Sequence, residues 1–257
     1  MHILLLSLTA SFSFFLYGVS ALGELVDLFS ANDTVTGTNY FCIKIPTLIE
    51  HPSTGFLIAL GEARVGSCAD VAWTDLVMRR STDGGGSWSP LEILISNSTA
   101  EEINVVGNAA PVVDRATGRI WLPYNRNNQE TWITYSDDAG ATWAPSTLHP
   151  ELQKSGWLWV GIGPPGGLQL SSGRLLIPGY HSEFWPAPDQ SSFGSGLTKG
   201  HVLLSDDHGE TWRIGADDFG HLSNEASYPS SIVHSAPSSP EEEKEGGEEE
   251  EEEEEEE

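Results

Sequence analysis

The sequence predicts an all-β protein assembled from one repeated structural unit. Short runs of β-forming residues alternate with Gly, Asp and Asn turns almost throughout. No stretch keeps a 3.6-residue period for longer than one or two turns. A pattern that reads S-x-D-x-G-x-[ST]-W occurs three times, at 81–88, 136–143 and 205–212. A motif that recurs along a chain marks one unit used several times.

The repeated motif has the chemistry of a tight turn. Its carboxylate accepts hydrogen bonds from the backbone that follows, its Gly takes a backbone angle that other residues avoid, and its Trp covers the edge of the unit's core. The copies lie about 55 and about 70 residues apart, close to the size of a four-stranded propeller blade. A β-propeller is therefore favoured over a β-sandwich. The motif carboxylates are assigned a structural role: Asp83, Asp138 and Asp207.

The expected strands fall between the motif copies. In each unit an apolar strand follows a turn such as T-G-R or S-G-R, and the next strand leads into the motif. The runs predicted to be strands are 55–60, 75–80, 119–124, 131–135, 174–180 and 201–205.

The two ends of the chain are expected to lie outside the fold. Residues 3–19 are apolar and lead into small residues at 19–21, which favours a cleaved signal peptide over 1–21, with an uncleaved anchor as the alternative. At the other end, 241–257 is almost pure Glu and cannot bury a core, so a disordered tail is predicted. A Pro/Ser linker is expected at 229–240, which leaves 22–228 for the partial propeller.

The charge balance excludes some classes of protein. Asp and Glu number 38 against 12 Lys and Arg, and no basic stripe is visible, so nucleic-acid binding is not expected. No metal site or cofactor is predicted, because the sequence has no C-x-x-C and no clustered His. His181 and His208 are assigned to loops.

Features tied to a secretory compartment are also present. Cys42 and Cys68 could pair in an oxidising compartment, but sequence alone leaves their proximity open. Asn32 and Asn97 stand in glycosylation sequons, which matter only in a secreted chain.

The repeated motif resembles the Asp-box of the sialidase (neuraminidase) superfamily. Further blocks at 43–48, 57–64 and 161–180 look like that family's R-I-P, E-x-R, G-P-G and G-R-L segments, so the resemblance covers about 38–225. It implies a sialidase-like β-propeller, which has six blades in the family. This chain has material for about three to four, and an incomplete ring would leave an open sheet edge for association.

The resemblance also implies catalytic residues. Asp70 lies in the loop that carries the acid/base Asp in sialidases, where a carboxyl group protonates the departing glycosidic oxygen and later activates water. Asp75 is the second candidate, although at a strand start it could simply cap a turn. Glu225, in an N-E pair after the third motif, matches the Glu that helps to ionise the family's nucleophilic Tyr.

Three residues are implied to contact substrate. Lys44 stands where the family has the first of three arginines that hold the sialic acid carboxylate. Arg64 fits a substrate contact, with an ion pair to Glu62 or Asp70 as the equal alternative. Asn108 could line the site or serve a turn.

Departures from the family pattern bear on activity. Lys44 keeps the positive charge of an arginine but loses its two-pronged geometry. The family's two later arginines and its nucleophilic Tyr have no counterpart after Glu225, and Tyr228 lacks the expected context. We therefore expect the chain alone to be nearly silent on sialosides.

The function expected from the resemblance is that of a retaining exo-α-sialidase acting on sialylated glycans, in an extracellular or lysosome-like compartment. The alternative is a catalytically inactive sialidase-like glycan-binding module. Another Asp-box propeller is disfavoured by the K-I-P block at Lys44 and by Asn224-Glu225.

The first prediction concerns processing. When the chain is expressed in a secretory host, its mature N-terminus should lie near Leu22, because the apolar run ends in a small-residue cleavage pattern. N-terminal sequencing of the purified protein checks this. Enzymatic removal of N-glycans should lower the mass, and an Asn32→Gln variant should lose part of that shift. A mature protein that begins at Met1 contradicts the prediction.

Overall fold

The computed structural model describes residues 26–99, 101–163, 166–183 and 198–215. The predicted signal peptide, linker and acidic tail lie outside these ranges, as do Glu225 and Tyr228.

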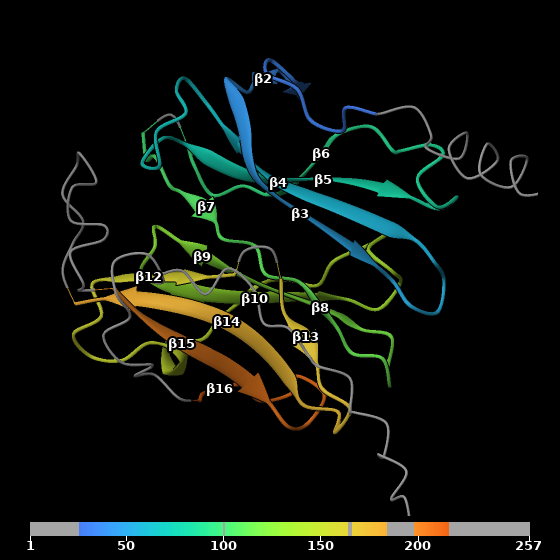
Figure 1. The fold of residues 1–257 in the computed structure, drawn as a ribbon. Coiled ribbons are helices and arrows are strands. Elements are labelled where there is room, and N and C mark those ends of the chain that lie inside the picture. Colours follow the sequence, from blue (N-terminus) through green and yellow to red (C-terminus); the bar gives the residue numbers. More distant parts are fainter. Residues whose placement is uncertain (1–25, 100, 164–165, 184–197, 216–257) are drawn as a thin grey trace, which may run out of the picture.

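The described residues form three blades, each an antiparallel sheet of four or five strands, that follow one another along the chain, and a separate two-stranded hairpin (Figure 1). The first blade has the strand order β3 (Cys42–Glu50), β4 (Leu57–Arg64), β5 (Thr74–Ser81) and β6 (Glu92–Ile95). In the second blade, the short strands β7 (Val106–Gly107) and β8 (Val112–Val113) both pair with β9 (Ile120–Arg126), followed by β10 (Glu130–Ser136) and β11 (Thr147–Leu148). The third blade repeats this arrangement with β12 (Trp159–Ile162), β13 (Leu168–Gln169), β14 (Leu175–Ser182), β15 (Thr198–Ser205) and β16 (Arg213–Ile214).

Each sheet is an antiparallel meander, in which two short strands share the first position of the second and third blades, and this order is typical of a propeller blade. The all-β prediction is confirmed, and the six predicted runs overlap β4, β5, β9, β10, β14 and β15. A hairpin of β1 (Thr34–Val35) and β2 (Thr38–Asn39) precedes the first blade. The described part contains one 3-10 helix, η1 (Pro150–Leu152), and no helix in it is long and apolar enough to cross a membrane.

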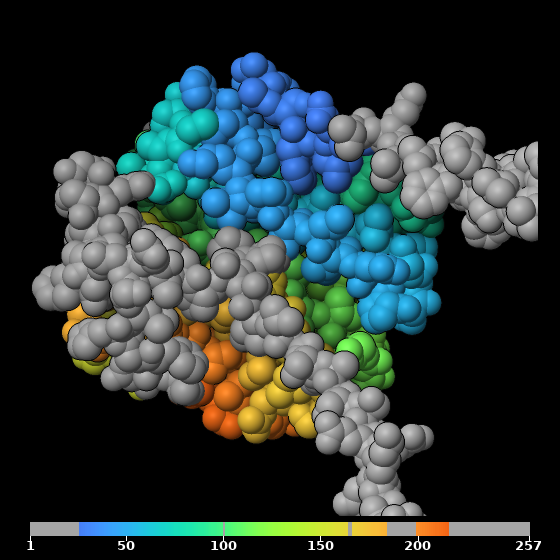
Figure 2. All heavy atoms as spheres, viewed as in Figure 1, coloured from blue at the N-terminus to red at the C-terminus, as the bar shows by residue number. Residues whose placement is uncertain are grey.

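Apolar side chains between the blades form the core. Leu60 and Leu76 of the first blade pack with Ile120 and Leu122 of the second, and all four are fully buried. In the space-filling view, blue and cyan residues of the first blade abut green residues of the second (Figure 2). Burial of each such side chain stabilises the fold by about 1.5–3 kcal/mol relative to exposure.

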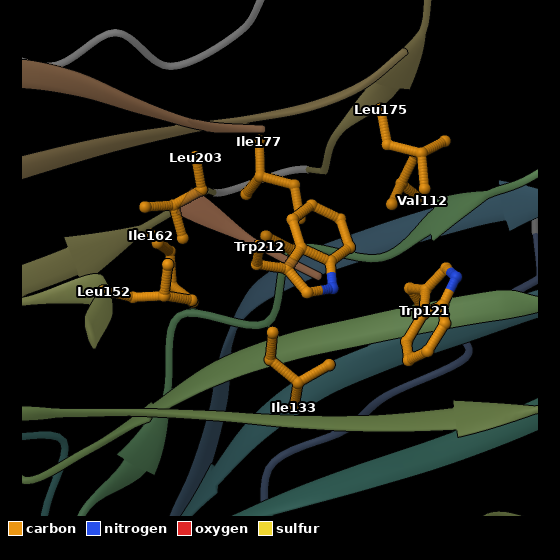
Figure 3. Close-up of a cluster of buried hydrophobic side chains, with 10 residues drawn as sticks. Val112, Trp121, Ile133, Leu152, Ile162, Leu175, Ile177, Leu203 and Trp212 are labelled. Atoms are coloured by element: carbon orange, nitrogen blue, oxygen red, sulfur yellow. The ribbon is translucent and has the colours of Figure 1, made fainter. Parts of the chain in front are cut away.

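A second cluster joins the second and third blades. Figure 3 shows the Trp212 indole in its centre, with Ile177 and Leu203 on one side and Ile133 and Trp121 on the other. Trp212 is the last residue of the third repeated motif. The expectation that the motif Trp covers core residues is met here, since Trp212 is only 5% exposed.

The three motif copies adopt one hydrogen-bonded turn between the third and fourth strands of each blade. In the second copy, Asp138 Oδ1 accepts the Thr142 N–H at 2.8 Å and Oδ2 accepts the Thr142 hydroxyl at 2.6 Å. The Gly140 N–H donates to Ser136 Oγ at 2.8 Å. Ala139 and Gly140 both have positive φ, 53° and 80°. The other two copies repeat these bonds within 0.1 Å.

The second and third turns also bind the preceding blade. Arg80 Nε donates to the Ala139 carbonyl at 2.7 Å, and Trp121 Nε1 donates to the His208 carbonyl at 2.8 Å. The glycines of these two turns leave no room for a side chain, because a Cβ on Gly140 would lie 2.5 Å from Ile58 and one on Gly209 would lie 2.1 Å from the Trp121 ring. The repeated turn is therefore also an inter-blade contact.

The two histidines assigned to loops have different positions. His208 lies in the third turn as expected, where its Nδ1 is 2.9 Å from buried Asp114 of the second blade. Burial opposes ionisation of Asp114, but hydrogen bonds led by the Thr117 hydroxyl hold its pKa below the usual value. The loop assignment of His181 was wrong. It lies in β14, is 2% exposed and stacks on Trp157, because blade packing buries the end of this strand.

The second prediction compares two neighbouring carboxylates of one turn. Asp138→Ala should lower the free energy of unfolding by about 1–2 kcal/mol, because it removes the acceptor of the turn's backbone and hydroxyl hydrogen bonds. Asp137→Ala should cost less than about 1 kcal/mol, because the ion pair of Asp137 with Arg119 is solvent-exposed. Denaturant unfolding of both variants checks this, and equal losses would contradict it.

Acid provides a control for the same pair. Hydrogen bonds from the Thr142 hydroxyl and N–H lower the pKa of Asp138 to about 2, below the value of roughly 3.9 for an unfolded Asp. A depressed folded-state pKa contributes stability above the unfolded pKa that is lost as pH falls through the folded one. The stability gap between the wild type and Asp138→Ala should therefore close between about pH 4 and pH 2.

Candidate active site

A cavity of about 240 Å³ opens at the end of the blades where β4, β9 and β14 finish. The repeated turns follow β5, β10 and β15, which run antiparallel to β4, β9 and β14. The turns therefore lie at the end of each sheet opposite the cavity. All three blades contribute lining residues, which are Ile45, Glu62, Arg64, Asp70, Val105, Gly107, Asn108, Asn128, Trp159 and Tyr180.

The K-I-P block forms a bulge in β3. The pairing of β3 with β4 shifts register between Lys44 and Thr47, and Ile45 has a φ of 50°, which is rare for a β-branched residue. Pro46 has no N–H to give to the ladder, so the interruption suits it. Such bulges redirect side chains. Here Ile45 reaches the cavity wall, and the Lys44 ammonium lies 4.0 Å from Asp70 Oδ1.

The end of β4 buries a charged pair. Glu62 and Arg64 lie two residues apart in β4, on the same face of the strand as Leu60. Their side chains are only 5% and 4% exposed. Arg64 Nη2 donates to Glu62 Oε2 at 2.8 Å. Arg64 Nη1 donates to Asp70 Oδ1 at 2.5 Å and to the Cys68 carbonyl at 2.7 Å. Burial opposes the charge, but these carboxylates raise the pKa of Arg64 above its ordinary value.

Asp70 is the accessible carboxylate beside this buried pair, with 40% of its side chain exposed. It lies in the loop of residues 65–73 between β4 and β5. A disulfide joins Cys68 of this loop to Cys42 at the start of β3. The pairing that the sequence left open is thus present, two residues before Asp70.

Asp75, the second acid/base candidate, has a different environment. It is 1% exposed, does not line the cavity, and accepts the Tyr40 hydroxyl at 2.8 Å and the Trp73 indole N–H at 3.0 Å. Burial and the bond to Asp75 raise the pKa of Tyr40. Both oxygens of Asp75 are engaged in the interior, which favours a structural role and leaves Asp70 as the acid/base candidate.

The second blade adds polar groups to the cavity. The Asn108 N–H donates to Glu62 Oε1 at 2.8 Å, and its Nδ2 lies 3.5 Å from Asn128 Oδ1. Asn108 has a φ of 55°, so the two roles considered for it, cavity lining and a special backbone conformation, occur together. Asn127 and Asn128 also have positive φ, and both lie in the three-residue turn between β9 and β10.

The third blade supplies an aromatic wall of Trp159 and Tyr180. The Tyr180 ring lies over Gly161, where an added Cβ would come within 2.2 Å of it. No motif marked Trp159 as a cavity residue. Glu62 was expected only as an ion-pair partner of Arg64, although the E-x-R spacing places both on one strand face.

The remaining predicted sites are placed as follows. Asn32 and Asn97 are exposed. Glu225 lies outside the described residues. Within the described ranges, no group of three or more His, Cys, Asp or Glu side chains could hold a metal ion. The arrangement thus offers one accessible carboxyl group beside two cations, which suits acid–base chemistry on a bound polar ligand.

Comparison with known proteins gives a consistent family match. Residues 72–236 match the BNR repeat-like domain family. Sialidase-4 of Homo sapiens is 33% identical over 204 residues, which cover 70% of this chain and 40% of that protein. The exo-alpha-sialidase of Aspergillus fumigatus is 29% identical over 177 residues, covering 56% of this chain and 42% of that protein. The chain thus spans less than half the length of these relatives.

Solved structures show the same fold. The Hadza microbial sialidase Hz136 superposes with a TM-score of 0.59 at 25% identity, covering 69% of this chain and 38% of that chain. The intramolecular trans-sialidase from Ruminococcus gnavus has a TM-score of 0.57 at 16% identity, covering 75% of this chain and 64% of that chain. The second similarity is one of fold alone.

The third prediction tests the buried charged pair. Glu62→Ala should lower the free energy of unfolding by about 3 kcal/mol, because it leaves the Arg64 guanidinium buried with less compensation. Glu102→Ala should change it by less than about 1 kcal/mol, since Glu102 pairs with Arg126 but is largely exposed. Denaturant unfolding measures both. A Glu62→Ala effect no larger than that of Glu102→Ala would contradict the burial argument.

Proposed function

Because the chain belongs to the sialidase superfamily of BNR-repeat β-propellers, we propose that it acts as an exo-α-sialidase-type glycoside hydrolase. Its substrates would be terminal sialic acids of glycoproteins, gangliosides or oligosaccharides. The single observation that carries the proposal is the position of Asp70. Its carboxyl group is accessible at the cavity and is held there by a buried Arg64.

Asp70 would act as acid and then as base. As the bond between the sugar and the leaving oxygen breaks, the Asp70 proton goes to that oxygen, and the leaving group departs as an alcohol. In the second step Asp70 takes a proton from the water that attacks the anomeric carbon. Two displacements at one carbon give retention. The nucleophile implied by the family is a Tyr, for which Glu225 would be the partner, and Glu225 lies outside the described residues.

The sialic acid carboxylate would meet Lys44 first. Arg64 already gives both terminal nitrogens to Glu62 and Asp70, so it is better placed to hold Asp70 than to bind a substrate carboxylate. Lys44 is 43% exposed and offers a point charge rather than the paired donors of an arginine. We expect the carboxylate to be held more weakly than by an arginine. Asn108 and Asn128 would contact other polar groups of the sugar.

A second candidate function is a catalytically inactive sialidase-like glycan-binding module. Two observations favour this function. Lys44 stands where the family has an arginine with paired donors, and both terminal nitrogens of Arg64 are already engaged by Asp70 and Glu62. Binding would use the cavity without needing acid–base chemistry at Asp70.

We also propose that the chain works in the secretory pathway or in an extracellular or lysosome-like compartment. The disulfide between Cys42 and Cys68 supports this, because such bonds persist in oxidising environments.

The fourth prediction tests the acid role of Asp70. Whatever residual hydrolysis of sialyllactose the chain supports, Asp70→Ala should slow it by about 10²–10⁴-fold, because the leaving group needs a proton. The loss on an aryl sialoside should be much smaller, since a phenolate leaves without one. Turnover of both substrates by the full chain and by the variant measures the difference. Equal losses on the two substrates would contradict an acid role.

Calorimetric titration with sialyllactose separates the two candidate functions. Binding without turnover would favour the glycan-binding module, and neither binding nor turnover would refute both. If the wild-type chain turns over the aryl sialoside, Tyr180→Phe is the first nucleophile test, because Tyr180 lines the cavity.

A further inference from the structure

The loop that carries Asp70 is exposed, yet the proposed chemistry needs a fixed carboxylate. Gly66, Ser67 and Ala69 are exposed, and Val71 beside Asp70 is 73% exposed. Exposed loops are mobile by default. A displacement of about 1 Å at a reacting group can cost about a hundredfold in rate. Something in the structure must therefore restrain this loop.

One restraint acts on the N-terminal side of Asp70. The disulfide fixes Cys68 to Cys42, and the Cys68 carbonyl also accepts a hydrogen bond from Arg64. Cys42 lies two residues before Lys44, so a single covalent bond fixes the backbone near both charged groups.

A second restraint acts on the C-terminal side of Asp70. The Trp73 indole donates to Asp75 Oδ1, and the Tyr40 hydroxyl donates to Asp75 Oδ2. Tyr40 is fully buried and packs in a cluster with Ala63 and Val77. The backbone of Trp73 is bonded as well, because its carbonyl accepts the Val65 N–H at 2.9 Å.

Both restraints end on the same short segment, residues 40–42. That segment is itself joined to the end of β4, because the Phe41 N–H donates to the Arg64 carbonyl at 2.7 Å. The loop is thus restrained on both sides of Asp70 by contacts with residues 40–42. This segment is in turn hydrogen-bonded to Arg64, the residue that contacts Asp70.

We infer that the Cys42–Cys68 disulfide and the Tyr40–Asp75–Trp73 hydrogen bonds form a loop clamp that positions Asp70 against Arg64. Tyr40, Trp73 and Asp75 are positioning residues in this assignment, and none of them lines the cavity. A buried carboxylate is a poor source of stability, because its desolvation offsets much of what its hydrogen bonds contribute. Its direct value is in fixing one arrangement of the chain. The inference rests on the proposed function where it concerns catalysis, and on geometry alone where it concerns the loop.

Hydrogen exchange tests the clamp without any need for activity. Tyr40→Phe removes one hydroxyl and keeps the buried ring. In the full chain, exchange of the amides over 65–73 should rise about tenfold, as expected for the loss of one buried hydrogen bond to a charged group. Cys42→Ala with Cys68→Ala should raise it in the same segment. The amides of Val65 and Ala72 are the reporters, since both are hydrogen-bonded within the loop.

Tyr124→Phe is the matched control. Tyr124 is also a buried tyrosine with a hydrogen-bonded hydroxyl, but it lies in β9 of the second blade. Its variant should leave exchange over 65–73 at the wild-type rate. The clamp is refuted if Tyr40→Phe leaves that exchange unchanged, or if Tyr124→Phe raises it equally.

A double-mutant cycle tests whether the clamp acts through Asp70. Tyr40→Phe should lower the turnover rate on sialyllactose about tenfold in the wild-type background, and should have no further effect in an Asp70→Ala background. The same tenfold loss in both backgrounds would reduce the clamp to a general stabilising role. If the full chain shows no turnover, the proposed function fails at that point, while hydrogen exchange still decides whether the clamp holds the loop.

Discussion

The contact of the second and third repeated turns with the blade that precedes each is the constraint on which the rest of the structure depends. Within the turn, the motif Asp accepts hydrogen bonds from a backbone N–H and a hydroxyl four residues later, and these bonds make the turn a rigid projection. That projection fits the blade before it, with the Arg80 and Trp121 side chains donating to its carbonyls. Blades that are consecutive in sequence are therefore neighbours in space. The cavity depends on this order, because it draws residues from all three blades at the other end of the sheets.

Much of the fold could be predicted because its signals are local. The motif carries its own hydrogen-bond partners within a few residues, and the strands alternate between clear turn residues. The placement of His181 could not be predicted in this way. Polar residues surround it in sequence, and its burial comes from Trp157 and from the packing of whole blades. Pairing of Cys42 with Cys68 likewise depends on how β3 lies against β4, which spacing alone does not define.

The candidate site also combines residues that local sequence signals predict with residues that only long-range packing places. Arg64 and Asp70 were predicted from one segment and Asn108 from another, and the structure places all three around one cavity. Of the two roles weighed equally for Arg64, the structure favours the ion pair, because its Nη1 and Nη2 donate to Asp70 and Glu62. Spacing alone could not decide between the two roles, since the choice depends on how deeply the pair is buried. Trp159 and Tyr180 reach the cavity only because a third blade follows two others, so no local pattern marks them.

The turn between β9 and β10 ties backbone conformation to ligand chemistry in a single residue. Asn128 adopts a positive φ that closes the hairpin, and its side chain faces the cavity beside Asn108. Glycine would suit the backbone better but has no side-chain amide to contact a ligand. A larger polar residue would keep a functional group but oppose the turn. A substitution of Asn128 that alters ligand recognition therefore also alters how easily the hairpin closes, so the two properties cannot evolve independently at this position.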